Sequence, residues 1–137
     1  MKKLLLFFLL LTGMAISQAQ PRIAVLEFKA GVGLSQNNVN GVAGIFSTYL
    51  IDTRQFQVME RVQIDRIVSE QNLQLSSLTE TQTVEIGRLL NVRYVVVGDV
   101  NLVMGQYTIA VRLLDAQNAT GIPRQLLNGN RGTAIWT

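Results

Sequence analysis

The fold is decided by residues Tyr94 to Val103, which read Tyr-Val-Val-Val-Gly-Asp-Val-Asn-Leu-Val. Three consecutive β-branched valines, Val95 to Val97, are typical of a central strand that is covered on both faces. Met104-Gly105-Gln106 can form a tight turn, and residues 107–114 then alternate, with Tyr, Ile, Val and Leu at the odd positions. This pattern predicts an antiparallel hairpin.

Upstream of the hairpin, short apolar runs and helical periodicities follow one another. The predicted elements are a strand over residues 22–28, a loop over 29–35, a helix with an apolar stripe from Val39 to Leu50, a strand over 56–60, a helix over 61–70, a packed loop over 71–78 and a helix from Thr79 to Leu90. This order predicts one α/β domain in which helices pack on a mixed sheet.

The first and last of these helices carry more detailed predictions. In the first, Asn37 and Asn38 are the expected N-caps. Ile45 and Ile51 widen its apolar stripe, so we expect it to be covered on more than one side. The last helix has a capping box that starts at Thr79. Its expected buried face consists of Thr83, Ile86, Gly87 and Leu90.

The N-terminus has the three parts of a secretory signal peptide. Met1-Lys2-Lys3 is basic, residues 4–11 are an unbroken apolar run, and Ser17-Gln18-Ala19 places small residues before a cleavage site. The apolar run is shorter than the ~18 residues of a membrane-spanning helix. We therefore expect a signal peptide over residues 1–19, a domain over 20–121 and an irregular tail over 122–137. A truncation, a frameshift and a natural short end all fit this tail.

Composition narrows the class of protein. The chain has 137 residues, enough for one domain, and contains neither cysteine nor histidine. Disulfides, thiol nucleophiles, Cys/His zinc sites and Ser-His or Cys-His catalytic pairs are thereby excluded. Without Lys2 and Lys3, 10 Lys and Arg stand against 9 Asp and Glu. This balance gives no support to nucleic-acid binding, and export without cysteine fits a bacterial envelope compartment.

Candidate chemistry is sparse. Gly31-Val32-Gly33 lies between a strand and a helix, where a phosphate-binding loop would be, but Gln36 stands where a dinucleotide fingerprint requires its third glycine. Acids such as Asp99 and Asp115 fit structural ion pairs and strand ends better than acid–base catalysis. Asp115 is expected to hold the amides of its turn. We predict no catalytic, cofactor-binding or metal-binding residue, and a small nucleotide-binding protein is the least favoured alternative.

Several segments together resemble one protein family. They are Arg-Ile-Ala-Val-Leu-Glu-Phe over residues 22–28, the passage over 49–61 that ends in Phe-x-Val-x-Glu-Arg, Gln-Asn-Leu-Gln-Leu over 71–75, Ile-Gly-Arg-Leu-Leu over 86–90 and Tyr-Val-Val-Val-Gly over 94–98. In this order and spacing they resemble the CsgG family of curli assembly and transport proteins, and the resemblance covers most of the chain after the signal peptide. It implies a three-layer α/β domain related to the TolB N-terminal domain and to the LpoB activator of penicillin-binding proteins.

The resemblance implies a non-enzymatic periplasmic protein without cofactors. It would act in curli-type envelope assembly or secretion through contacts with envelope or secretion proteins, or with copies of itself. Channel-forming members of the family carry an acylated cysteine and long membrane-spanning hairpins. Here no cysteine is present, and only Met104-Gly105-Gln106 joins the strands where one hairpin would be inserted. We therefore expect membrane association that is only peripheral or through partners. An oligomeric outer-membrane secretion pore, or an accessory of one, is the alternative.

The matching segments also single out six residues for structural roles. They are Phe56, Val58, Glu60, Arg61, Gly87 and Gly98. Phe56 and Val58 are expected to pack on the sheet. Glu60 and Arg61 are expected to hold the start of the following helix by charge and capping.

Overall fold

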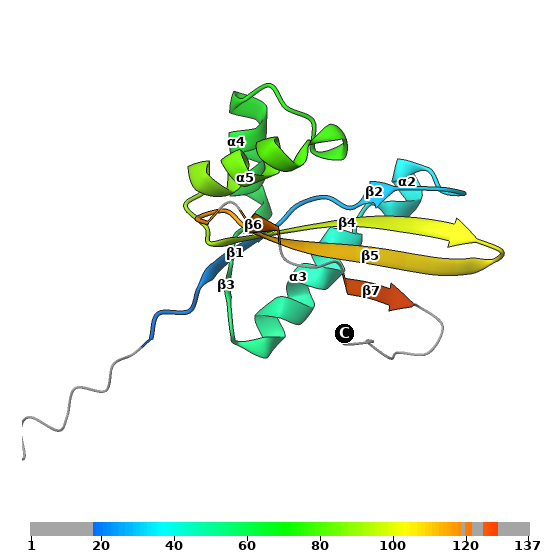
Figure 1. Cartoon of the computed structure of the whole chain (residues 1–137), viewed down its shortest axis with the longest axis horizontal. Helices are drawn as coiled ribbons and strands as arrows, with labels where there is room; N and C mark the ends of the chain where they lie inside the picture. Colours follow the sequence, from blue (N-terminus) through cyan, green and yellow to red (C-terminus); the bar gives the residue numbers. More distant parts are fainter. Residues whose placement is uncertain (1–17, 119, 122–124, 129–137) are drawn as a thin grey trace, which may run out of the picture.

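The computed structural model describes residues 18–118, 120–121 and 125–128 (Figure 1). At its centre β4 (Tyr94–Val103) and β5 (Gln106–Asp115) pair antiparallel along their whole length. Met104 and Gly105 join them with φ angles of 51° and 75°, which is the backbone of a two-residue hairpin turn. The predicted hairpin is confirmed. Residues 1–17, most of the predicted signal peptide, lie outside the described residues.

The hairpin is part of a mixed sheet. β1 (Arg22–Val25) and β2 (Lys29–Ala30) pair in parallel with β4, and β3 (Gln57–Val58) pairs in parallel with β1. On the other side, β6 (Thr120–Gly121) and β7 (Gln125–Asn128) pair antiparallel with β5. The strand order is β3, β1, β4, β5, β6, with β2 also on β4 and β7 also on β5.

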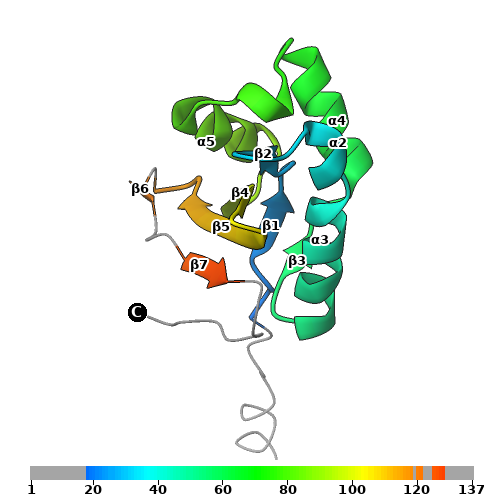
Figure 2. The same cartoon turned by 90° about the vertical axis from the view of Figure 1, so that its right-hand side faces the viewer.

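Helices cover both faces of the sheet and give the domain three layers (Figures 1 and 2). α2 (Gln36–Val39) and α3 (Val42–Thr53) lie on one face. α4 (Arg61–Glu70) and α5 (Glu80–Leu89) lie on the other, joined by a segment with a 3-10 turn at Leu75–Ser77. The single three-layer α/β domain that the sequence predicts is confirmed.

Two hydrophobic cores separate the layers, because successive strand residues point to opposite faces. Ala24 of β1 and Val95 of β4 belong to the core under α4 and α5. Their neighbours Val25 and Val96 belong to the core under α3. The valine run of β4 thus serves both cores, as expected of a central strand.

The last helix matches its prediction closely. The N–H of Gln82 donates to the hydroxyl of Thr79 at 3.2 Å, and the N–H of Thr79 donates to Oε1 of Gln82 at 2.9 Å. These two bonds are the predicted capping box. The predicted inner face is buried in full, at Thr83, Ile86, Gly87 and Leu90.

The first predicted helix is divided in two. Gly41 has a φ of +94° and separates α2 from α3, a conformation that glycine adopts without steric cost. α2 begins after Ser35, whose N–H donates to Oδ1 of Asn38 at 3.0 Å. The predicted N-caps Asn37 and Asn38 are therefore wrong, since both lie inside α2.

Short strands account for the other differences. The predicted strand over 22–28 ends at Val25, and β2 occupies the start of the predicted loop. The predicted strand over 56–60 is reduced to Gln57–Val58. The tail predicted to be irregular contains β7, which pairs with β5 from Val111 to Thr108. Such short strands exist because a neighbouring strand offers backbone partners, and a periodic pattern of two to four residues cannot reveal this.

Candidate interaction site

An open groove of about 420 Å³ lies between one flank of α3 and the start of α4. One wall is the flank of α3 that carries Gly41, Ala43, Gly44, Ser47 and Ile51. The floor includes the buried side chains of Val25 and Ile64, and the start of α4 supplies Glu60 and Arg61 to the rim. We call this feature the α3–α4 groove.

Small residues keep the α3 wall open. A Cβ atom built on Gly41 or Gly44 would meet no atom of the described residues within 4 Å. The positive φ of Gly41 explains its glycine. Gly44, the third residue of α3, has no such backbone requirement. The packing of the described residues therefore does not explain why the wall has glycine at residue 44.

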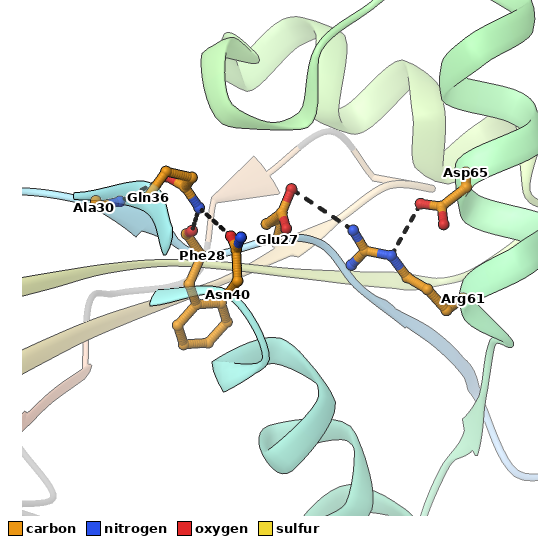
Figure 3. Close-up of polar contacts among 7 residues, drawn as sticks. All are labelled: Glu27, Phe28, Ala30, Gln36, Asn40, Arg61 and Asp65. Carbon is orange, nitrogen blue, oxygen red and sulfur yellow. Dashed lines mark hydrogen bonds and ion pairs between the residues drawn. The ribbon is translucent and has the colours of Figure 1, made fainter. Parts of the chain in front are cut away.

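Charged side chains line the rim beside α4 (Figure 3). The guanidinium of Arg61 lies 3.7 Å from Glu27 through Nη2 and 2.9 Å from Asp65 through Nε. Glu60 is the N-cap residue of α4, but its exposed side chain makes no capping hydrogen bond. Glu60 thus holds the expected capping position, and its backbone carbonyl, not its side chain, accepts from the N–H groups of Gln63 and Ile64. Arg61 instead links the start of α4 to the segment after β1.

Gln36 closes the adjacent edge of the sheet. Its Nε2 donates to the carbonyl of Phe28 at 2.8 Å, and its Oε1 accepts from the N–H of Ala30 at 3.1 Å (Figure 3). The side-chain amide thus occupies the position that one peptide group of a further strand would take. Edge strands with free backbone groups invite pairing with other chains, and Gln36 removes this opportunity at β2.

Among the described residues, two exposed apolar surfaces lie outside the groove. The first, the α3 flank, consists of Ile45 and Tyr49, which are 63% and 69% exposed. They stand one helical turn apart. The expectation that α3 is covered on more than one side is not met within the described chain. The second, the hairpin tip, consists of Val32, Val103, Met104 and Tyr107, and Met104 is 99% exposed.

The aromatic and aliphatic motif residues lie against the sheet. Phe56 packs edge-on against Tyr94, with ring centroids 6.3 Å apart and planes at 85°. Val58 is half-buried beside the core under α3. Both positions agree with packing roles.

The two motif glycines mark close approaches. A Cβ on Gly87 would lie 2.6 Å from the Ala116 and Val95 side chains, so α5 can reach the sheet only with glycine there. A Cβ on Gly98 would lie 2.7 Å from the ring of Phe28.

Asp115 holds the turn after β5. Its Oδ1 accepts from the N–H groups of Gln117 and Asn118, both at 3.0 Å, and its Oδ2 accepts from the Asn118 amide at 2.9 Å. Burial raises the pKa of this carboxyl, but these hydrogen bonds and the charge of Arg93 outweigh burial, so the pKa of Asp115 is lowered. The predicted turn role is confirmed.

The described residues offer little for catalysis or cofactor binding. No three acidic side chains among them gather as a metal site would require. In the glycine loop, the N–H groups of Gly31 and Val32 already donate to the Val100 carbonyl at 2.8 Å and to Oδ1 of Asn101 at 2.9 Å. Two of the loop amides that a phosphate would need are therefore already engaged. Within the same residues, no helix is long and apolar enough to cross a membrane.

The sequence interpretation singled out Glu60 and Arg61 of the rim for structural roles but did not identify the groove. The run Gly41, Ala43, Gly44 and Ser47 is visible in the sequence as a small-residue face and could have indicated an open wall. The link from Arg61 to Glu27 has no such signal, because it depends on how α4 meets the sheet.

Comparisons with known proteins agree with this architecture. The family model described as curli production assembly/transport component CsgG matches residues 9–117. No curated protein matches the chain. Among solved structures, the LpoB C-terminal domain from Escherichia coli has a TM-score of 0.65 at 15% identity, over 83% of this chain and 85% of that one.

Two further structures are similar. Lipoprotein GNA1162 from Neisseria meningitidis has a TM-score of 0.63 at 10% identity, over 84% of this chain and 85% of that one. TolB from Acinetobacter baumannii has a TM-score of 0.52 at 18% identity, over 83% of this chain but 25% of TolB. At these identities the similarities establish the shared fold.

Proposed function

The chain belongs to the CsgG family, and from this premise we propose that it is a non-enzymatic protein of the bacterial envelope that acts in assembly or secretion by binding other proteins. The observation that carries the proposal is the gathering of exposed apolar side chains on the α3 flank and the hairpin tip. Clustered apolar exposure is typical of surfaces that meet a partner. The sparse chemistry of the described residues supports the same conclusion.

The proposed location is the periplasm. Its support is the signal-peptide pattern over residues 1–19, together with membership of an envelope family. Export with cleavage after Ala19 gives a protein that begins at Gln20. Intact mass measured on protein recovered from the periplasm tests this N-terminus directly.

The proposed partners are envelope or secretion proteins, including further copies of the chain. A curli-type role is the specific form of the proposal and has the family description as its support. The alternative is an oligomeric outer-membrane secretion pore or a pore accessory, which the same description also supports.

Light-scattering mass of the purified protein, with and without detergent, separates these two functions. The proposed function predicts a monomer or small oligomer whose mass does not depend on detergent. A large uniform ring that takes up detergent would contradict it and favour the pore.

A further inference from the structure

We propose that the α3–α4 groove binds an extended segment of a partner protein in which an apolar side chain stands next to an arginine or lysine. This inference rests on the proposed function, because both treat the chain as a protein-binding domain. It adds the place at which the partner binds and the chemistry that selects it.

The groove has the size and lining to hold an apolar side chain. Its volume of about 420 Å³ falls within the ~300–1,000 Å³ of typical small-ligand pockets. Val25 and Ile64 lie beneath the groove and are only 3% and 1% exposed, whereas Ile51 stands on the α3 wall with 57% of its surface exposed. An apolar side chain placed here would remove this surface from water, which is favourable.

Gly44 is the observation that points to an outside occupant. It lies within α3, where glycine is less favourable than alanine. Neither a positive φ nor a close neighbour in the described part of the chain requires it, since a Cβ there would meet none of those residues within 4 Å. Gly87 shows the contrast, because its glycine is required by contact with the sheet. The open wall at Gly44 leaves room for a segment of another protein to lie against α3.

The rim selects a basic neighbour. Arg61 is shared between Glu27 and Asp65, and Glu60 has no ion pair with any described residue. The other nearby cation, Arg22, lines a smaller neighbouring pocket together with Glu60, and its guanidinium donates to the sulfur of Met59 at 3.8 Å. Figure 3 shows the carboxylates of Glu27 and Asp65 on the Arg61 guanidinium. With Glu60 and Arg22 counted as well, three carboxylates stand against two guanidinium groups, an excess of one negative charge. A lysine or arginine on the incoming segment complements this excess, and an acidic segment is repelled.

Two matched peptides test the proposal by nuclear magnetic resonance of the ¹⁵N-labelled protein. The first is acetyl-Ser-Leu-Arg-Leu-Ser-amide, and the second has glutamate in place of arginine. The arginine peptide is expected to give saturable shifts of the backbone amides of Gly41, Gly44, Ser47 and Ile64. The glutamate peptide is expected to bind at least about threefold more weakly, as for an exposed charge contact.

Three variants assign the binding to the groove. Gly44→Leu fills the open wall and is expected to abolish saturable binding, while Glu60→Gln is expected to weaken the arginine peptide about threefold. Ser69→Leu places the same side chain on an exposed position of α4 outside the groove and is expected to leave binding unchanged. Dispersed spectra of the unbound variants establish that each one folds.

Three results would overturn the proposal. They are the absence of saturable shifts with the arginine peptide, equal binding of the two peptides, and unchanged binding by Gly44→Leu. Shifts confined to the α3 flank or the hairpin tip would also overturn the groove as the site. That last result would leave the proposed function intact, whereas a detergent-binding ring would contradict the proposed function whatever the peptides do.

Discussion

At the scale of single residues, the clearest contrast is between Gly44 and Gly87. Gly87→Ala forces a Cβ to within 2.6 Å of Val95 and Ala116, and overpacking of this kind costs about 1–3 kcal/mol. Gly44→Ala meets open space and is expected to raise the free energy of unfolding by about 0.5 kcal/mol. Urea unfolding of both variants measures the two changes. Changes of the same sign would contradict this account of the glycines.

Asp115 predicts a dependence of stability on pH. Because the pKa of its carboxyl is lowered in the folded state, the charged carboxylate stabilises the fold above the ordinary aspartate pKa of about 3.9. This contribution is lost as pH falls through the folded-state pKa. Asp115→Asn is therefore expected to destabilise the protein at pH 7 and to differ little from the wild type in strong acid. Urea unfolding across pH checks this, and a constant difference between the two proteins would contradict it.

At the scale of elements, the edge of β2 depends on one side chain. Gln36→Leu removes the two side-chain hydrogen bonds at this edge, the one donated to the Phe28 carbonyl and the one accepted from the Ala30 N–H. Orphaned backbone groups of this kind cost about 1–3 kcal/mol when buried, and these are partly buried. We expect a lower melting temperature for Gln36→Leu, while Asn37→Leu, on an exposed neighbour, serves as the control. Equal melting of the two variants would show that Gln36 does not close the edge.

Helices and strands whose signals lie in neighbouring residues could be predicted from the sequence. Strands that form only because another strand offers backbone hydrogen-bond partners could not. The capping box at Thr79, the bounds of α4 and the valine strand all depend on residues close in sequence. β2 and β7 exist because β4 and β5 offer them backbone partners. The division at Gly41 was missed because the apolar stripe continues across it, from Val39 to Val42.

At the scale of the whole molecule, the layers follow from the sequence, but the groove does not. The order of strands and helices predicts the three-layer arrangement, because each amphipathic helix must cover one face of the sheet. The groove forms where α3 and α4, from opposite layers, reach the same sheet edge. Glu27 and Arg61 meet there from positions far apart in the sequence. A contact between residues so far apart in the sequence depends on the complete fold, and no pattern of neighbouring residues indicates it.

The central claim is that this family member acts through its exposed surfaces. Photo-crosslinking in the cells that produce it tests this most directly, with p-benzoyl-phenylalanine placed at Tyr49 of the α3 flank, at Met104 of the hairpin tip and at the exposed control position Arg66 of α4. The account predicts discrete crosslinked products from Tyr49 or Met104 and none from Arg66. No product from either apolar surface, or the same products from Arg66, would contradict it.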